Sequence, residues 1–150
     1  MATELGRAYE AYEVAPATYQ HLTQVLPAAK LHLADGCQMA QTGDAVVDLV
    51  FTCPPYHQLE RYEEAIGQLS ELRTYEAFLT KIQECAGAIG RVLRPGRFCC
   101  WVCADWRDGK AFRLFHQDCL LAFQVAELIP WDIVIVVNNS PFAPLQAGKV

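Results

Sequence analysis

The sequence contains no apolar stretch of about 18 or more residues, the length that a membrane-spanning helix needs. Its first residues lack a basic segment followed by an apolar core, so we expect no secretory signal peptide. Basic residues are also few, with 12 Lys and Arg against 17 Asp and Glu and a net charge of −5. This charge argues against a generic nucleic-acid binder, whose affinity comes from basic side chains that neutralise phosphates, without excluding one. We therefore expect a cytoplasmic chain with no membrane partner.

What the sequence does contain is enough apolar material for one core. Of its 150 residues, 53% are hydrophobic and 19% are charged, which is typical of a globular chain that is rich in apolar positions. A chain of this length can form one α/β domain, and we expect a single domain over residues 1–150. The seven cysteines cannot all pair within one chain, and in an intracellular protein we expect them to be thiols.

Apolar patterns predict strands that alternate with helices. Strands are expected at residues 7–14, 30–36, 45–52, 98–104 and 131–137. Helices are expected from Pro16, from the candidate N-cap Thr74 to the breaker sequence 94–97, and over 112–126, with loops at 105–109 and 138–150. Because several of these strands are apolar on both faces, we expect a mostly parallel sheet with helices on both faces.

The carboxyl ends of parallel strands are where such folds bind ligands. They carry Glu13, Asp35, the corner Cys53–Tyr56 and Asp105. In the corner, Pro54 and Pro55 fix φ and lack N–H groups, so the chain leaves the strand in a rigid, extended form with carbonyls free to accept. Tyr56 adds a flat face. This corner suits a planar group that carries an amino donor, and a nucleobase is one such group.

The stretch "DLVFTCPPY" (48–56) resembles motif IV of the S-adenosylmethionine-dependent amino-methyltransferases, which methylate adenine N6 or cytosine N4 in DNA. Three further segments resemble that family in order and spacing. They are "LGRAYEAYEVAPATY" (5–19), "LADG" (33–36) and the long segment 75–105. The resemblance implies a Rossmann-like methyltransferase fold, S-adenosylmethionine as cofactor and DNA as partner.

The resemblance also implies a role for each matching residue. Cys53 and the carbonyl of Pro54 would accept hydrogen bonds from the target amino group, and Pro55 completes the rigid pair. Tyr56 would stack on the flipped base. By the same resemblance, Glu13 would hold the cofactor ribose and Asp35 would lie near the cofactor adenine. Alignment of the two reactants does most of the catalysis in this family, so neither a metal nor a covalent nucleophile is required.

Two departures from the family pattern leave alternatives open. Cys53 stands where the family has an oxygen acceptor, and sulfur is a weak acceptor, so the target base stays open between adenine and cytosine. The sequence also lacks the Phe-x-Gly-x-Gly cofactor motif and a last strand. We expect an incomplete domain: a fragment, a remnant, or a split enzyme whose partner chain or missing segment supplies that motif. The alternatives are a non-catalytic binding module of this fold and a methyltransferase of RNA guanine N2 or protein glutamine.

The remaining candidate residues give weaker indications of a functional role. Cys99, Cys100 and Cys103 alternate across a predicted strand and have no second Cys or His pair at ligand spacing, so we expect core thiols and no metal site. His57, beside the corner, is expected to be an ordinary loop residue.

The three tryptophans divide by position. Trp101 and Trp131 fall in predicted strands and are expected in the core. Trp106 follows a strand end in a predicted loop, and is the aromatic residue that we expect to serve a binding role.

Overall fold

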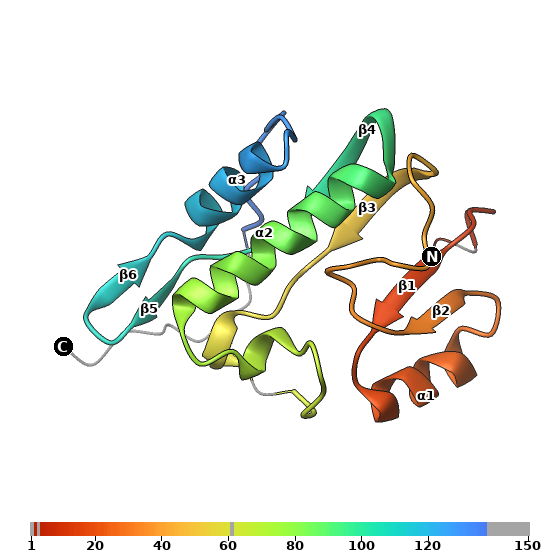
Figure 1. Ribbon diagram of the computed structural model, residues 1–150, viewed down its shortest axis with the longest axis horizontal. Helices are drawn as coiled ribbons and strands as arrows, with labels where there is room; N and C mark the ends of the chain where they lie inside the picture. The colour runs from red at the N-terminus through yellow and green to blue at the C-terminus, as the bar shows by residue number, and fades with distance from the viewer. Residues whose placement is uncertain (1, 3, 61, 138–150) are drawn as a thin grey trace.

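The computed structural model describes residues 2, 4–60 and 62–137 (Figure 1). The strands are β1 (Glu10–Glu13), β2 (Lys30–Leu33), β3 (Val47–Thr52), β4 (Leu93–Trp101), β5 (Trp106–Asp108) and β6 (Ala111–Arg113). The α-helices are α1 (Pro16–Val25), α2 (Tyr75–Val92) and α3 (Phe115–Val125), and the 3-10 helices are η1 (His57–Leu59) and η2 (Leu69–Glu71). Helices and strands alternate as the sequence predicts, so the α/β class is confirmed.

The strands form two parallel pairs and one antiparallel hairpin. β1 pairs with β2 from Glu10 opposite Lys30 to Glu13 opposite Leu33, and β3 pairs with β4. The parallel direction is as expected. The single mostly parallel sheet is wrong for the described part of the chain, where these two pairs do not share a hydrogen-bonded edge. In the antiparallel hairpin, β5 lies where a loop was expected at 105–109, and β6 takes up the start of the helix expected over 112–126, which begins at Phe115 instead.

The breaker sequence at residues 94–97 follows the end of α2 at Val92, as predicted, and forms a bulge inside β4. Val47 pairs with Leu93 and Leu49 pairs with Phe98, so four residues of β4 face one residue of β3. That residue is Asp48, and its carboxylate contacts Arg94 Nη1 at 2.9 Å and Arg97 Nε at 3.3 Å. The breaker sequence therefore interrupts the ladder without ending the strand, since the pairing with β3 resumes at Phe98.

Helix α2 contributes buried side chains to both clusters of the core. It begins as predicted at Thr74, whose side-chain oxygen accepts a hydrogen bond from the N–H of Ala77 at 3.2 Å. Its apolar face includes Phe78, Ile82 and Ile89, which are fully buried. One part of this face packs against α3 and the hairpin, and another against β3 and β4. Each of these side chains stabilises the fold by roughly 1.5–3 kcal/mol through burial.

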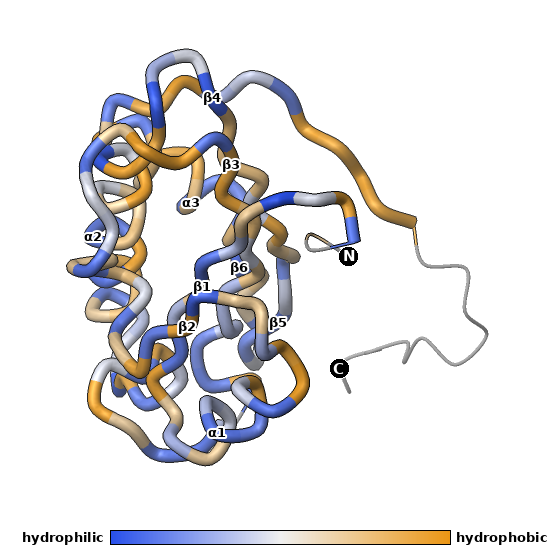
Figure 2. Tube along the Cα trace, turned by 90° about the vertical axis from the view of Figure 1, so that its right-hand side faces the viewer, coloured by the Kyte–Doolittle hydropathy of each residue, from blue (hydrophilic) through white to orange (hydrophobic). Residues whose placement is uncertain are grey.

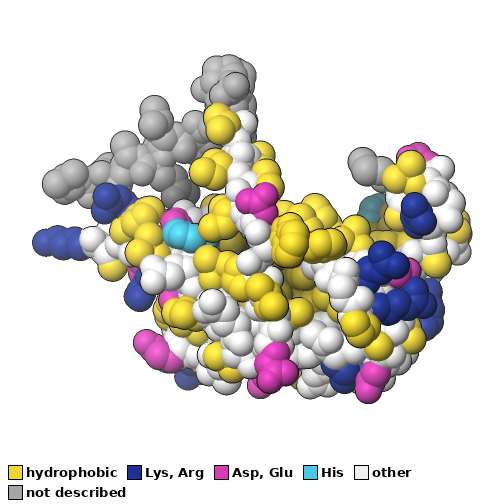
Figure 3. All heavy atoms as spheres, turned by 90° about the horizontal axis from the view of Figure 1, so that it is seen from above, with side chains coloured by type: hydrophobic (Ala, Val, Ile, Leu, Met, Phe, Trp, Pro, Cys, Tyr) yellow, Lys and Arg dark blue, Asp and Glu magenta, His cyan; other side chains and the backbone are white. Residues whose placement is uncertain are grey.

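The prediction that helices cover both faces of the strands is wrong for β3 and β4. Val50 and Cys99 lie on the face that packs against the cluster around Ile89. On the other face, Leu49 is 59% exposed and Phe51 is 70% exposed. The physical reason is that α3 packs beside α2 and contacts Trp101 on the same face of the strands, so the described residues supply cover for one face. Figure 3 shows hydrophobic side chains gathered across the middle of the surface seen from above.

Residues 131–137 do not form the predicted fifth strand. After α3 the chain turns at Glu127 (φ 60°), and the apolar segment then runs away from the body of the molecule (Figure 2). A strand needs a hydrogen-bonded neighbour as well as β-branched side chains, and the described residues provide none. Trp131 is 81% exposed, so its predicted core position is also wrong, although its ring contacts that of Phe98 with centroids 6.0 Å apart.

The predicted loop at 138–150 lies outside the described residues. Among the helices of the described part, none is long and apolar enough to cross a membrane.

Candidate functional site at the carboxyl end of β3

The corner begins where β3 stops. The carbonyl of Thr52 accepts a hydrogen bond from the N–H of Val102 at 2.9 Å, which is the last backbone link between the two chain segments. Cys53 then lies exposed, while Pro54 is buried. Two prolines cannot donate to a neighbouring strand, so the ladder ends here and the chain leaves the sheet before η1.

Three carbonyl groups of this corner accept no hydrogen bond from the described residues. Tyr56 O accepts from the N–H of Leu59 at 2.9 Å, within the turn that starts η1. Among the described residues, by contrast, no donor bonds the carbonyls of Cys53, Pro54 or Pro55. A carbonyl without a partner can accept a hydrogen bond from a ligand, as expected from the paired prolines.

Tyr56 lies between the corner and the core. Its ring meets Trp106 and Phe115 edge to face, with centroids 6.1 Å and 6.3 Å apart, and its hydroxyl is 3.9 Å from the sulfur of Cys53. Burial, followed by the nearby Cys53 thiol, raises the pKa of Tyr56 to about 12. The phenol therefore stays protonated at neutral pH, and its position is fixed by the aromatic cluster behind it.

His57 and Trp106 both contact side chains of the core. The Nε2 atom of His57 lies 3.0 Å from the carbonyl oxygen of Leu72, and its ring packs on Phe78 with centroids 5.3 Å apart. Trp106 is 8% exposed and belongs to the cluster of α2 and α3, so the binding role predicted for it is wrong. The hairpin explains the difference, because β5 starts at Trp106 and faces it inward where a loop would have left it in solvent.

Glu13 lies at the end of β1, and its side chain bonds the chain just before α1. Its Oε1 atom accepts a hydrogen bond from the N–H of Ala15 at 2.8 Å. The described residues place no donor on its second oxygen, Oε2. Glu13 thus combines a local structural bond with one available acceptor at a strand end.

Asp35 follows β2 and has both carboxylate oxygens bonded. Oδ1 accepts from the N–H of Cys37 at 2.8 Å, and Oδ2 lies 2.9 Å from Nζ of Lys81 on α2. Burial opposes the charge of Lys81, but its bonds to Glu84 and Asp35 outweigh that effect and raise its pKa. No signal in the sequence indicates this ion pair, since Lys81 falls on a helix well beyond the strand that Asp35 follows.

The structure brings the predicted residues together in two groups. Glu13 and Asp35 lie at the adjacent ends of β1 and β2, since Glu13 pairs with Leu33. Cys53, Pro54, Pro55 and Tyr56 lie at the end of β3, in the other parallel pair. Figure 1 shows β1 and β3 pointing in a similar direction, so both groups follow the carboxyl ends of their strands.

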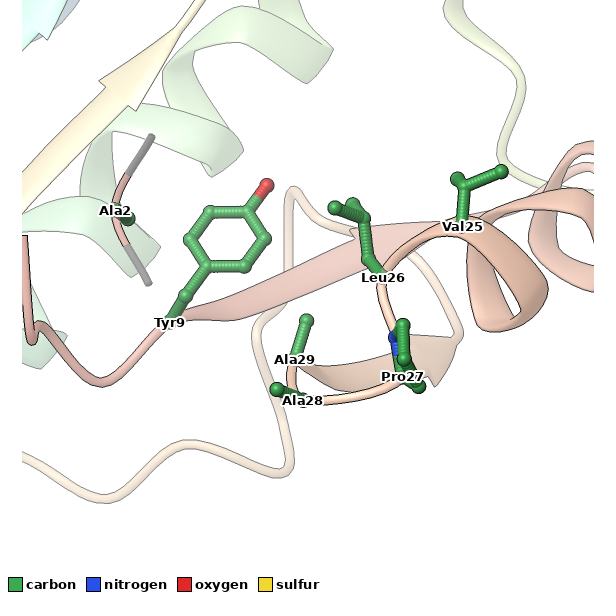
Figure 4. Close-up of a pocket in the computed structure, with 7 residues that line it drawn as sticks. All are labelled: Ala2, Tyr9, Val25, Leu26, Pro27, Ala28 and Ala29. Carbon is green, nitrogen blue, oxygen red and sulfur yellow. The ribbon is translucent and has the colours of Figure 1, made fainter. Parts of the chain in front are cut away.

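A pocket of about 330 Å³ lies at the opposite ends of β1 and β2 (Figure 4). Tyr9, just before β1, and Ala29, just before β2, are among its lining residues, together with the end of α1. Tyr9 is the one lining side chain with a polar group. This apolar pocket is separate from the strand ends that carry the predicted site residues.

The cysteines and Trp101 divide between core and surface. Burial raises the pKa of the half-buried Cys99 to about 12, which fits the expected core thiol. Cys100 is exposed on the uncovered face, so the same expectation is wrong there. The half-buried Trp101 packs on Phe123 with centroids 5.1 Å apart. Within the described residues, no three His, Cys, Asp or Glu side chains are grouped as metal ligands.

Comparison with solved structures finds several matches, and three of them are crystal structures of one protein. The chain is similar to TTHA0409 from Thermus thermophilus, a candidate DNA modification methylase. For the selenomethionine derivative, the TM-score is 0.49 at 25% identity, and the match covers 62% of this chain and 36% of that one. A second structure gives 0.48, and a complex with S-adenosyl-L-methionine gives 0.47, both at 26% identity with 62% and 38% coverage.

This chain thus spans a little over a third of the length of the structures that it matches. No protein-family model matches the chain, and no curated protein does.

Proposed function

We propose that this chain is part of an S-adenosylmethionine-dependent methyltransferase that modifies the exocyclic amino group of adenine (N6) or cytosine (N4) in DNA. The corner Cys53–Tyr56 is the observation that carries the proposal. It combines a carbonyl at Pro54 that has no donor among the described residues with an aromatic ring held by the core. The order of the flanking segments, which resembles that of the DNA amino-methyltransferases, supports the same function.

Each residue of the corner contributes to orienting the amino group. The Pro54 carbonyl accepts a hydrogen bond from one amino N–H and so holds the nitrogen with its lone pair directed out of the base plane. Tyr56 stacks on the base, which has to leave the duplex to reach this corner. Cys53 is a weak second acceptor. S-adenosylmethionine, when bound, supplies the electrophilic methyl group that the nitrogen attacks.

The strand ends fit one part of this cofactor. Glu13 has an oxygen that no described residue bonds, and it can accept from a ribose hydroxyl. Both oxygens of Asp35 are already bonded, to Cys37 and Lys81, which is a poorer fit to the adenine end. The sequence also lacks the glycine-rich motif for the methionine end. We therefore expect this chain alone to bind S-adenosylmethionine weakly or not at all, and low-micromolar binding in calorimetry would contradict that expectation.

The deciding experiment is methyl transfer from labelled S-adenosylmethionine to duplex DNA by the full-length protein. Tyr56→Ala should cost roughly 1–3 kcal/mol of base stacking and slow transfer accordingly. It should leave cofactor binding unchanged, because the ring faces the base. Tyr9→Ala, at the other end of β1, is the matched control. Transfer by Tyr56→Ala at the unaltered rate would show that the corner is a structural turn.

A non-catalytic binding module of the same fold is the second candidate. The ion pair between Asp35 and Lys81 favours this second candidate. The Asp35 carboxylate would contact the cofactor in a methyltransferase, but here it bonds Lys81. The variant Asp35→Asn distinguishes the two functions. In a methyltransferase this change weakens cofactor binding as well as stability, whereas in the binding module it lowers stability alone.

A further inference from the structure

The β5–β6 hairpin is fastened at its base. Its innermost pair is Trp106 opposite Arg113. Just outside this pair, the Oδ1 atom of Asp105 accepts a hydrogen bond from the backbone N–H of His116 at 3.1 Å, and the same carboxylate lies 2.8 Å from His116 Nδ1. These bonds close the base of the hairpin and join it to the first turn of α3.

The base of the hairpin borders the corner Cys53–Tyr56. The N–H of Val102 bonds the carbonyl of Thr52, so the chain that leads into β5 leaves the strands beside the chain of the corner. Trp106, the first residue of β5, meets the ring of Tyr56 with centroids 6.1 Å apart. A nucleotide whose base stacks on Tyr56 stays joined to its neighbours through phosphates, so the backbone of the nucleic acid runs close to this hairpin.

The two faces of the hairpin carry different side chains. Side chains alternate between the faces along a strand, and directly opposed residues share one face. Trp106 is buried and the guanidinium of its partner Arg113 lies 4.7 Å from the centre of the Tyr75 ring, so this face is turned to the core. Arg107 and Phe112 are opposed on the other face, and both are exposed. The hairpin therefore presents a cation and an aromatic ring to solvent.

Two cations of the hairpin have no acidic partner among the residues that the structure describes. Arg107 lies over the Phe112 ring, with its guanidinium carbon 5.7 Å from the centroid, and it forms no ion pair. Lys110, in the turn between β5 and β6, is exposed and likewise unpaired. Figure 3 shows Lys and Arg side chains projecting at the end of the molecule where Figure 1 places the hairpin. We call Arg107, Lys110 and Phe112 the basic face.

The acidic residues beside the basic face are already engaged. Asp108 lies 3.0 Å from the guanidinium of Arg113, and Asp105 is bonded to His116. The whole chain has a net charge of −5, so an unpaired basic face next to the corner is a local exception to its composition. A surface of this kind is complementary to an anion such as a backbone phosphate.

We propose that the basic face of the β5–β6 hairpin binds the phosphate backbone of the DNA beside the base that enters the corner. Arg107 can pair with a phosphate through two N–H donors, and Lys110 adds a point charge at the turn. The Phe112 ring limits the positions that the guanidinium can take. Phosphate contacts position a duplex and carry no sequence information. This inference rests on the proposed function, because that function supplies DNA as the partner.

The test is the salt dependence of DNA binding by the full-length protein, measured by fluorescence anisotropy with a labelled duplex and without S-adenosylmethionine. Each phosphate contact contributes roughly 0.9 to the slope of the logarithm of the binding constant against that of the salt concentration. Arg107→Ala and Lys110→Ala should each reduce the slope by about that amount, and the double variant by about twice as much. Arg107→Lys, which keeps the charge, should retain most of the slope. The reductions should be the same for two duplexes of unrelated sequence.

Arg94→Ala is the matched control, because it removes the same charge from an exposed position near the other end of β4. It should leave the slope unchanged. A slope that neither Arg107→Ala nor Lys110→Ala alters, or that Arg94→Ala reduces equally, would overturn the proposal. Tighter binding to a single-stranded RNA of the same sequence would overturn DNA as the partner.

Methyl transfer, measured separately, distinguishes this inference from the proposed function. If the salt slope depends on Arg107 and Lys110 but no methyl group is transferred, the proposed function is wrong and the basic face still binds DNA. If methyl transfer to DNA occurs and the slope does not depend on these residues, the basic face is wrong and the proposed function stands.

Discussion

Both faces of the β3–β4 pair carry apolar side chains, but the described residues cover only one of them. The face with Val50 and Cys99 packs against the cluster around Ile89 of α2, whereas Leu49 and Phe51 on the other face are more than half exposed. Exposed apolar surfaces of this kind are unusual on a monomeric soluble protein and mark contact sites. The difference shows that an apolar strand pattern encodes the need for cover on both faces, while the partner elements decide which face receives it.

The largest expected effect contrasts a buried phenylalanine of α2, in the cluster with α3 and the hairpin, with an exposed phenylalanine on the uncovered face of β3. Phe78→Ala on α2 should destabilise the fold by about 3–5 kcal/mol, because it removes a fully buried ring and leaves a cavity. Phe51→Ala on the uncovered face should change stability by no more than about 0.5 kcal/mol, since the ring is 70% exposed. Urea unfolding followed by circular dichroism measures both changes. A cost for Phe51→Ala near that of Phe78→Ala would mean that the second face is covered in solution.

The elements that the sequence predicted well are those with purely local signals. The cap at Thr74 and the apolar spacing of Phe78, Ile82 and Ile89 specify α2 by themselves. The paired prolines likewise determine where β3 ends. The β5–β6 hairpin was missed because its strands have three residues each, too short for a period-2 pattern, although Gly109, whose φ is 59°, is a turn signal.

The features that the sequence could not predict depend on contacts between distant residues. Whether residues 131–137 become a strand depends on a neighbour that the described residues do not provide. The ion pair of Asp35 with Lys81 joins a strand end to a helix, and no spacing rule anticipates it. At the candidate site, the strand end and the unbonded carbonyls of Cys53–Pro55 could therefore be predicted from the sequence, whereas the engagement of Asp35 could not.

A smaller effect concerns the helix that supplies the cover. Thr74→Ala removes the side-chain acceptor for the N–H of Ala77 and should cost about 1 kcal/mol of stability. Thr80→Ala is the matched control, because Thr80 lies inside α2 and its hydroxyl bonds only the carbonyl of Glu76 one turn back. Since alanine favours the helix interior, that control should be neutral or slightly stabilising. Equal losses for the two variants in urea unfolding would contradict the assignment of Thr74 as the cap.

The smallest expected effect is a change of stability with pH. It should be present in the polar β1–β2 pair and absent from the apolar core around α2. The Glu10 carboxylate lies 2.7 Å from Thr42 Oγ1, 2.8 Å from His32 Nε2 and 3.3 Å from Lys30 Nζ. Burial raises the pKa of Glu10, but the hydrogen bonds from Thr42, His32 and Lys30 outweigh it, so that the pKa lies below its ordinary value of 4.5.

A carboxyl group with a pKa lowered by folding stabilises the folded state above its unfolded value, and this contribution is lost as pH falls through the folded pKa. Glu10→Gln should therefore lower stability at neutral pH and lose its effect as the pH drops below 4.5. The cost of Ile89→Ala, at a fully buried position packed among apolar side chains and thiols, should stay the same over that range. Urea unfolding at a series of pH values checks both slopes. A Glu10→Gln cost that persists in acid would show that the charge of Glu10 contributes nothing and that its shape alone holds the β1–β2 pair.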